Sequence, residues 1–258
     1  MGTGGVVVKL SEQIASGKTV LAAWCGLCDP LVAELLVREG FDTAVLDMQH
    51  GAYDIASAMK GIGNVALAAK PAIVRIPVGD FSKASRLFDS GAAAVIAPMI
   101  NSLADARSFA AFSKFPPLGE RSWGPHRAIA LTDMDPASYF KQANSIQLSI
   151  AMIETREALA ALDDILAVPG IDGVFVGPSD LSIALSGGSA VNPESAEVDA
   201  ALTHIVARAE AQGKFAAVFT FSGAKARDLS ARGYALCSIA TDQLLLRAGA
   251  RVELAAAR

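Results

Sequence analysis

Residues 170–182 read GIDGVFVGPSDLS and contain a complete strand-to-helix junction. The apolar run Ile171–Val176 is typical of a strand buried on both faces, as strands of parallel sheets are. The Gly-Pro pair that follows ends the strand and begins a helix, because proline is favoured at the first helical position. The segment therefore predicts a strand followed directly by a helix, with Ser179 and Asp180 at the junction.

The same strand-to-helix unit recurs along the chain. Between the apolar runs lie stretches with helix signals, such as Asp29-Pro30 before LVAELLVREG, where Gly40 ends the helix. Residues 155–170, TREALAALDDILAVPG, are likewise expected to form one helix with an apolar stripe. The predicted strands are Thr19–Trp24, Thr43–Asp47, Ala72–Ile76, Ala93–Met99, Gln147–Ile153, Ile171–Val176, Phe215–Thr220 and Tyr234–Ile239.

Eight parallel strands alternating with helices in a chain of 258 residues are typical of an α/β TIM (β/α)8 barrel. No Pro/Gly/Ser-rich linker, charge run or repeat divides the chain, so one domain over residues 1–258 is expected. The alternative is an open doubly wound sheet, which would gather its functional groups at one switch point instead of around a ring.

Composition excludes several classes of protein. With 22 Lys plus Arg, 26 Asp plus Glu and a net charge of −4, the chain lacks the clustered basic surface of a nucleic-acid-binding protein. Uncharged stretches such as Ser90–Ala104 are too short and too interrupted to span a membrane. The start, MGTGGVVVKLSEQ, has no leader pattern, and Val6 replaces the Ser or Thr of a myristoylation signal, which predicts a cytoplasmic protein.

The most conspicuous short motif is WCGLCDP, in which Cys25 and Cys28 flank the start of a helix as in thioredoxin-type redox sites. A thioredoxin fold is much shorter and mixes parallel with antiparallel strands. Zinc is also disfavoured, because no second pair of Cys or His completes four ligands. We therefore interpret both cysteines as small apolar packing residues.

Polar groups follow the predicted strand ends, where a barrel carries its catalytic residues. Asp47 and His50 follow the second strand, Arg75 ends the third, and Glu154 and Asp180 follow the fifth and sixth. Lys18, Lys70 and Lys214, by contrast, precede strands, and no lysine is placed at a strand end to form the Schiff base of a class I aldolase.

Glu154 and Asp180 are the candidate metal ligands. Two carboxylates, with the other positions left to water and substrate, suit Mg²⁺, Mn²⁺ or Co²⁺ better than structural Zn²⁺. An ordinary rim residue or helix cap remains the alternative for each. The helix start in Gly177-Pro178-Ser179-Asp180 could bind a small anion, or Ser179 or Asp180 could simply cap the helix.

His50 is a candidate general base, because Asp47 lies three residues earlier and could orient its ring. His204, in a predicted helix, and His126, in a predicted loop, have weaker claims. Arg75 at the end of an apolar strand needs an anionic partner, which could be a substrate carboxylate, an enolate oxygen or a neighbouring carboxylate.

Taken together, these residues resemble the HpcH/HpaI aldolase family of metal-dependent class II pyruvate aldolases, from about Gly17 to Ala240. The resemblance rests on several ordered segments: FDTAVLDMQHG, IVRIP, GAAAVIAPMI with the following ARSF, PPLGERSWGPHRA, IETREALAALDDIL and GIDGVFVGPSDLS.

The resemblance implies a role for each candidate residue. His50 would be the general acid/base, oriented by Asp47, and Arg75 would stabilise the enolate. Glu154 and Asp180 would bind the metal, and the amides of residues 177–180 would hold the pyruvate carboxylate. Asp89 also matches a family acid, but it precedes a strand and could contribute only to a neighbouring subunit.

The resemblance also implies a homohexamer, built as a trimer of dimers that exchange the C-terminal helix TDQLLLRAGARVELAAAR, and a place in aromatic catabolism. The chain departs from the family at Met48-Gln49, where many members have Gly-Glu, and at Met152, where many have Gln. Such changes could alter hydrogen bonds around the metal ligands and hence metal or substrate preference.

The expected reaction is reversible aldol cleavage of a 4-hydroxy-2-oxo acid to pyruvate and an aldehyde, with a divalent metal ion and no organic cofactor. Oxaloacetate decarboxylation passes through the same enolate and is a possible side activity. The alternatives are an acyl-CoA lyase, which needs a basic groove that the sequence does not show, and a catalytically silent barrel.

Overall fold

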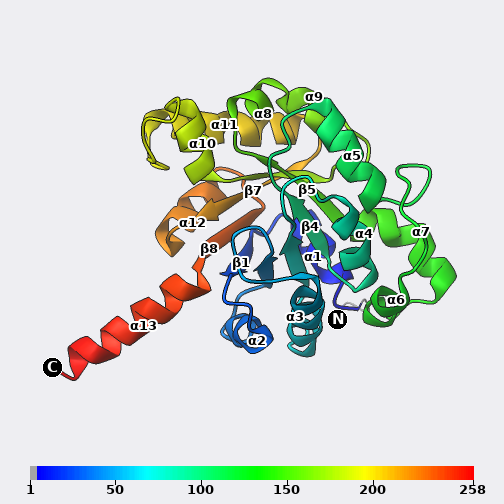
Figure 1. Cartoon of the computed structure of the whole chain (residues 1–258), viewed down its shortest axis with the longest axis horizontal. Coiled ribbons are helices and arrows are strands. Elements are labelled where there is room, and N and C mark those ends of the chain that lie inside the picture. The colour runs from blue at the N-terminus through cyan, green and yellow to red at the C-terminus, as the bar shows by residue number, and fades with distance from the viewer. Residues whose placement is uncertain (1–4) are drawn as a thin grey trace.

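The computed structural model describes residues 5–258, in which eight parallel strands form a closed barrel in chain order. The helices surround the barrel, as Figure 1 shows, and this confirms the TIM-barrel prediction over the open sheet. Predicted and observed strand ends agree to within about two residues. The strands are β1 Val20–Cys25, β2 Thr43–Asp47, β3 Ala72–Arg75, β4 Ala94–Ala97, β5 Leu148–Ile153, β6 Gly173–Val176, β7 Phe215–Thr220 and β8 Leu236–Thr241.

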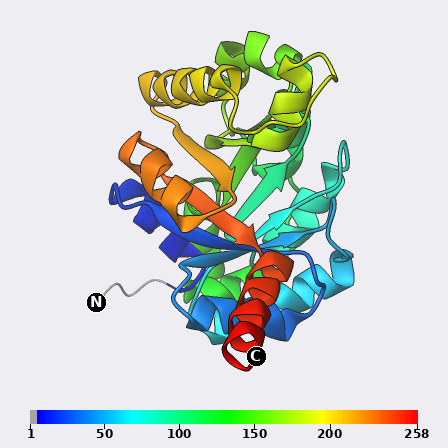
Figure 2. The ribbon, with the colours of Figure 1, turned by 90° about the vertical axis from the view of Figure 1, so that its left-hand side faces the viewer.

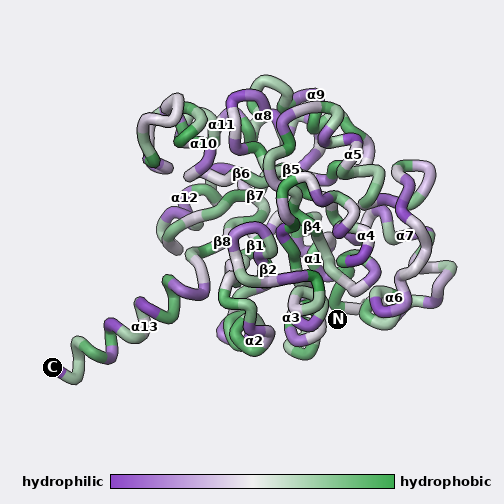
Figure 3. Tube along the Cα trace, in the orientation of Figure 1, coloured by the Kyte–Doolittle hydropathy of each residue, from purple (hydrophilic) through white to green (hydrophobic). Residues whose placement is uncertain are grey.

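Alternating residues of each strand supply two apolar layers, because successive side chains point to opposite faces. In β1, Ala22 and Trp24 belong to the barrel interior, whereas Ala23 and Cys25 pack outward against the helices. Figure 3 shows apolar residues concentrated along the strands. Both faces are therefore buried, which explains why the strands are near-continuous apolar runs.

The helices follow the strands with the predicted local signals. Asp29 caps α2, where its carboxylate accepts a hydrogen bond from the Leu31 amide at 2.9 Å, and Pro30 is the first helical residue. The helices are α1 Val8–Ala15, α2 Pro30–Arg38, α3 Ile55–Leu67, α4 Ser82–Asp89, α5 Leu103–Ser113, α6 His126–Thr132, α7 Pro136–Ile146, α8 Arg156–Ala160, α9 Leu162–Leu166, α10 Pro178–Leu185, α11 Ala196–Ala211, α12 Gly223–Ala231 and α13 Asp242–Ala256.

Two predictions for the helical regions were wrong. The segment 155–170 is not one helix, because Ala161 leaves the helical conformation and separates α8 from α9. The two halves have different neighbours: α8 packs against α10, whereas α9 packs against α5 and α11. His126 begins α6 and is not in a loop, but it is exposed, as is His204 on α11.

The last helix, α13, leaves the barrel and projects away from it as an arm (Figure 1). Figure 2 views the molecule from the side of this arm, so that α13 lies in front of the barrel. Asp242 is its buried residue, and several apolar side chains along it are exposed, including Leu246 at 56% and Val252 at 65%. None of the helices in residues 5–258 has the length and apolarity needed to cross a bilayer. Residues 1–4, part of the segment from which the absence of a leader was predicted, lie outside the described residues.

Candidate active site

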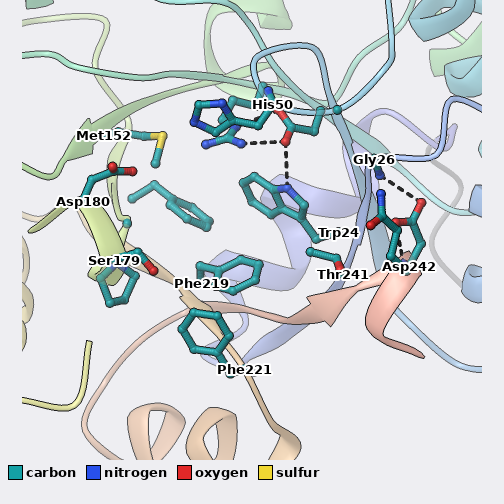
Figure 4. Close-up of a pocket in the computed structure, with 17 residues that line it drawn as sticks. Trp24, Gly26, His50, Met152, Ser179, Asp180, Phe219, Phe221, Thr241 and Asp242 are labelled. Carbon is teal, nitrogen blue, oxygen red and sulfur yellow. Dashed lines mark hydrogen bonds and ion pairs between the residues drawn. The ribbon is translucent and has the colours of Figure 1, made fainter. Parts of the chain in front are cut away.

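A cavity of about 320 Å³ lies at the carboxyl ends of the strands, where the barrel rule places a catalytic site. Its lining residues at the strand ends include Trp24, Arg75, Met152, Phe175 and Phe219. Figure 4 shows these side chains and their neighbours around one common space. Most of the predicted site residues line it as well, namely Asp47, His50, Arg75, Gly177, Pro178, Ser179 and Asp180.

Asp47 and Arg75 form a buried, bidentate ion pair at the cavity floor. They are direct partners in the β2–β3 register, so both side chains emerge at the same level of the barrel. Arg75 donates from Nε to Asp47 Oδ1 at 2.9 Å and from Nη2 to Oδ2 at 2.6 Å. Of the three anionic partners considered for Arg75, the structure shows the neighbouring carboxylate.

Trp24 contacts both members of the Asp47–Arg75 ion pair. Its indole Nε1 donates to Asp47 Oδ2 at 3.2 Å, and the Arg75 guanidinium lies 4.8 Å from its ring centroid. Burial alone would raise the pKa of Asp47, but the hydrogen bonds and charge of Arg75 outweigh this and hold that pKa below its usual value. Asp47 is therefore a fixed carboxylate that keeps the Arg75 guanidinium in place.

Asp47 also holds the backbone of the following loop. Its Oδ1 accepts from the amides of Gln49 at 3.0 Å and His50 at 3.3 Å. Within residues 5–258, no hydrogen bond joins the Asp47 carboxylate to the His50 ring. The expectation that Asp47 orients the imidazole directly is thus corrected: it positions His50 through the backbone and leaves the exposed ring at the cavity (Figure 4).

Glu154 directly follows β5 and is 1% exposed, so it does not itself line the cavity but lies against Gly177, which does. Its Oε1 accepts from the Met99 amide at 2.9 Å, whereas Oε2 is buried without a hydrogen-bond partner among the described residues. Burial, reinforced by the charge of Asp180 and opposed by the Met99 amide, raises the pKa of Glu154 to about 7. A buried, unpartnered carboxylate oxygen is costly unless a proton or a cation compensates it.

Gly177 gives this oxygen its room, since a Cβ at that position would lie 2.6 Å from Glu154 Oε2. Asp180 lies in the first turn of α10, and its charge acts on Glu154. The two carboxylates fit a divalent cation that leaves positions open for water and substrate. Within the described part of the chain, no group of three or more His, Cys, Asp or Glu could hold a metal, so the two carboxylates stay a predicted pair of ligands.

The start of α10 is the candidate site for a carboxylate. Gly177 occupies the N-cap, Pro178 follows it, and no side chain among the described residues caps this end. The alternative that Ser179 or Asp180 caps the helix is therefore wrong. Amides in the first turn of an uncapped helix are available to an anion.

Asp89 lies away from this cavity. It ends α4, ahead of β4, and its Oδ1 accepts from Arg121 Nη2 at 2.7 Å. Arg121 also donates to Tyr139 and to Gln147, which precedes β5. The structure thus places Asp89 at the amino-terminal end of the barrel, and its action on a neighbouring subunit stays a prediction.

These findings agree with comparisons to known proteins. The family model for HpcH/HpaI aldolase/citrate lyase matches residues 21–248. The chain belongs to the HpcH/HpaI family. It is accordingly a carbon–carbon lyase.

Relatives in the HpcH/HpaI family cover nearly the whole chain. A hydroxypyruvate/pyruvate aldolase of Rhizorhabdus wittichii is 40% identical over 242 residues, which are 94% of this chain and 95% of that protein. A 4-hydroxy-2-oxo-heptane-1,7-dioate aldolase of Salmonella heidelberg is 33% identical over 247 residues, or 96% of this chain and 92% of that one. The crystal structure of the HpcH/HpaI aldolase from Desulfitobacterium hafniense matches with a TM-score of 0.87 and 27% identity, over 96% and 95% of the two chains.

The cysteines of this HpcH/HpaI family member have the environment expected of packing residues. Cys25, Cys28 and Cys237 are all free, and Cys25 is buried between β1 and the helices. Burial raises the pKa of the Cys25 thiol well above its usual value, which disfavours the reactive thiolate.

Sequence reasoning missed three groups at the cavity. Trp24 lies at the end of β1, and the same strand-end rule that found Arg75 could have found it. Phe219 and Phe221 are at the end of β7 and just beyond it, where no charged residue drew attention. Asp242 is 1% exposed and accepts from the amides of Gly26 and Leu27, both at 2.9 Å, which ties the loop after β1 to α13.

Proposed function

We propose that this enzyme catalyses the reversible, metal-dependent aldol cleavage of a 4-hydroxy-2-oxo acid to pyruvate and an aldehyde. The observation that carries the proposal is the unpartnered Oε2 of Glu154, which is buried against Gly177, a residue that lines the same cavity as Arg75 and His50. Glu154 and Asp180 would hold a Mg²⁺, Mn²⁺ or Co²⁺ ion, whose positive charge would stabilise negative charge developing on the 2-oxo acid.

Each remaining residue has a role that its environment supports. His50, exposed at the cavity, would accept the proton of the 4-hydroxyl group as the C3–C4 bond breaks. The bonding electrons pass to the pyruvate enolate, whose C3 then takes a proton from water to give pyruvate. The carbon that lost the hydroxyl proton leaves as the aldehyde, and His50 returns its proton to solvent.

Arg75 would face the developing enolate oxygen. Its Nε and Nη2 are bound by Asp47, while Nη1 makes no hydrogen bond to a described residue. A guanidinium already fixed by Asp47 stabilises developing charge without the cost of reorganising. The free amides at the start of α10 would hold the substrate carboxylate.

We further propose that the enzyme is a cytoplasmic homo-oligomer, with a hexamer built from dimers that exchange α13. The projecting arm and its exposed apolar residues support this arrangement, because such a helix gains little from its own barrel. In such an assembly, Asp89 would lie close enough to act at the active site of a neighbouring subunit.

Metal dependence tests the function. Chelation should abolish aldol cleavage and oxaloacetate decarboxylation, and Mg²⁺, Mn²⁺ or Co²⁺ should restore both. Glu154→Gln should lose Mn²⁺ binding measured by calorimetry together with both activities. The matched control is Glu157→Gln, an exposed position on α8, which should retain them. Full activity in a preparation shown to be metal-free would refute the proposal.

A further inference from the structure

We propose that the aldehyde in this reaction is aromatic, and that an aliphatic aldehyde with a distal carboxylate is a poor substrate. The inference rests on the function proposed above and names the substrate class of the same cavity.

One part of the cavity lining is a continuous aromatic wall, which we define as Trp24, Phe175, Phe219 and Phe221. The Trp24 ring centroid lies 5.5 Å from that of Phe175 and 5.5 Å from that of Phe219, and the Phe219 and Phe221 centroids are 5.1 Å apart. The exposed fraction rises from 0% at Phe175 and 4% at Trp24 to 49% at Phe221. The aromatic wall therefore runs from the cavity floor to its mouth.

The aromatic wall lines the part of the cavity that we assign to the aldehyde. The bond that breaks joins C3 of pyruvate to the carbon whose hydroxyl group gives its proton to His50. Pyruvate itself is assigned to the side of Asp180 and the α10 amides. Figure 4 shows His50 at one side of the cavity and Phe219 and Phe221 at another. We infer that a substituent on the aldehyde carbon, pointing away from His50, extends along these rings.

The charges around the cavity disfavour a carboxylate on that substituent. Among the lining residues that the structure describes, Arg75 and His50 are the possible cations, and Asp47 already binds the Arg75 guanidinium. The other charged side chains at the lining, Asp180 and Asp242, are acids. Along the buried part of the aromatic wall, a distal carboxylate would thus lose hydration against rings and acids, with no free cation in return among the described lining residues.

An aromatic substituent would instead make favourable contacts. Aromatic rings attract one another in edge-to-face and offset arrangements, and Trp24 and Phe219 already adopt an edge-to-face pair with an interplanar angle of 90°. The cavity volume of about 320 Å³ lies near the lower end of small-molecule sites, which suits pyruvate and one compact ring.

The test compares aldehydes in the synthesis direction at fixed, saturating pyruvate and metal. We expect kcat/KM for benzaldehyde to be at least tenfold higher than kcat/KM for 4-oxobutanoate. It should also be severalfold higher than kcat/KM for cyclohexanecarbaldehyde. Phe219→Leu and Phe221→Leu should each lower the benzaldehyde to 4-oxobutanoate ratio by about three- to tenfold, the scale of one aromatic contact. Phe221→Arg should lower the ratio further by supplying a cation. Phe112→Leu, at a similarly exposed position on α5, is the control and should leave the ratio unchanged.

A second measurement separates the two proposals. Exchange of the pyruvate C3 protons with D₂O, followed by NMR, reports enolate formation without any aldehyde. If exchange is metal-dependent but 4-oxobutanoate is preferred, or the ratio is unchanged in both leucine variants, the aromatic assignment is wrong and the aldolase function stands. Equal use of cyclohexanecarbaldehyde and benzaldehyde would also overturn it. If neither exchange nor any aldol product appears, both proposals fail.

Discussion

Two arginine–aspartate pairs lie at opposite ends of this barrel, and the arginine of each pair is buried. Arg75 and Asp47 end neighbouring strands, whereas Arg121 pairs with Asp89, which ends a helix ahead of β4. The partners of Arg75 are Asp47 and the face of Trp24, and the residue lines the cavity. Arg121 donates to Asp89, Gln147 and Tyr139, so its hydrogen bonds stay within the protein.

The difference teaches that the residue types alone do not identify the catalytic pair. Both pairs contain a buried arginine and a short arginine–carboxylate contact, although Asp89 is 24% exposed. What separates them is their position relative to the strand ends, because the carboxyl ends surround a cavity and the amino ends meet the packed helices. Changes at the carboxyl ends of the strands should therefore affect catalysis, and changes at the amino ends should affect stability.

The largest effect is expected at His50. His50→Ala should reduce aldol cleavage by about 10² to 10⁴-fold, the usual scale of a general acid/base. Oxaloacetate has no hydroxyl proton to remove, so its decarboxylation should retain a larger fraction of activity. The measurement is kcat/KM for both reactions at matched metal saturation, with His204→Ala as the exposed control. An equal loss in both reactions, with unchanged folding and metal affinity, would contradict this division of labour.

The next effect is expected at Arg75. Arg75→Ala should lower both reactions by about 10² to 10³-fold, because both pass through the enolate that the guanidinium stabilises. Rates are compared per folded protein, since the change also leaves Asp47 buried without its cation. Activity within threefold of the parent protein would contradict a catalytic role for Arg75. The Arg75–Asp47 pair would then stabilise the fold, as the Arg121–Asp89 pair is expected to do.

Arg121 should act on stability instead. Arg121→Met should lower the free energy of unfolding by about 1–3 kcal/mol, because it leaves the buried oxygens of Gln147 and Tyr139 without this donor and Asp89 without its cation. Denaturant titration measures this, and Arg107→Met on the exposed side of α5 is the control. The folded fraction should keep kcat/KM within a few-fold. A large loss of kcat would instead favour the predicted action of Asp89 on a neighbouring subunit.

The ion pair at the cavity should make stability depend on pH. The pKa of Asp47 is lowered in the folded protein, so its ionised form contributes stability that is fully present above the unfolded value of about 3.9. That contribution is lost as pH falls through the lower folded pKa. The difference in unfolding free energy between the parent protein and Asp47→Asn should therefore be constant from pH 7 to 5 and shrink below pH 4. A difference that stays constant down to the acid transition would contradict the pKa direction.

The smallest effect is expected at the cysteines. Replacing Cys25 and Cys28 together with Ser should leave turnover within a few-fold, with some stability lost from the buried Cys25 position. A thiol–disulfide exchange activity that disappears in this variant would show that the motif is functional after all.

Local patterns in the sequence determined the architecture. Each of these patterns spans only a few residues: the apolar runs, the Asp29-Pro30 helix start and the Gly-Pro junction after β6. Each agrees with the structure. The order of strands and helices then fixed the barrel, and the strand-end rule placed Asp47, Arg75 and Glu154 at one end. Such signals depend on short-range backbone preferences and hydrophobic periodicity, which a sequence displays directly.

Only the tertiary structure decided which of these groups touch. The sequence left open which anion Arg75 meets, and strand pairing gave it Asp47, 28 residues away. The unpartnered oxygen of Glu154 and the aromatic wall from β1, β6 and β7 depend on side chains that barrel closure brings together. The break at Ala161 likewise follows from packing against different helices. These outcomes depend on contacts between segments that are distant in the sequence, and the periodicity of a single segment does not predict such contacts.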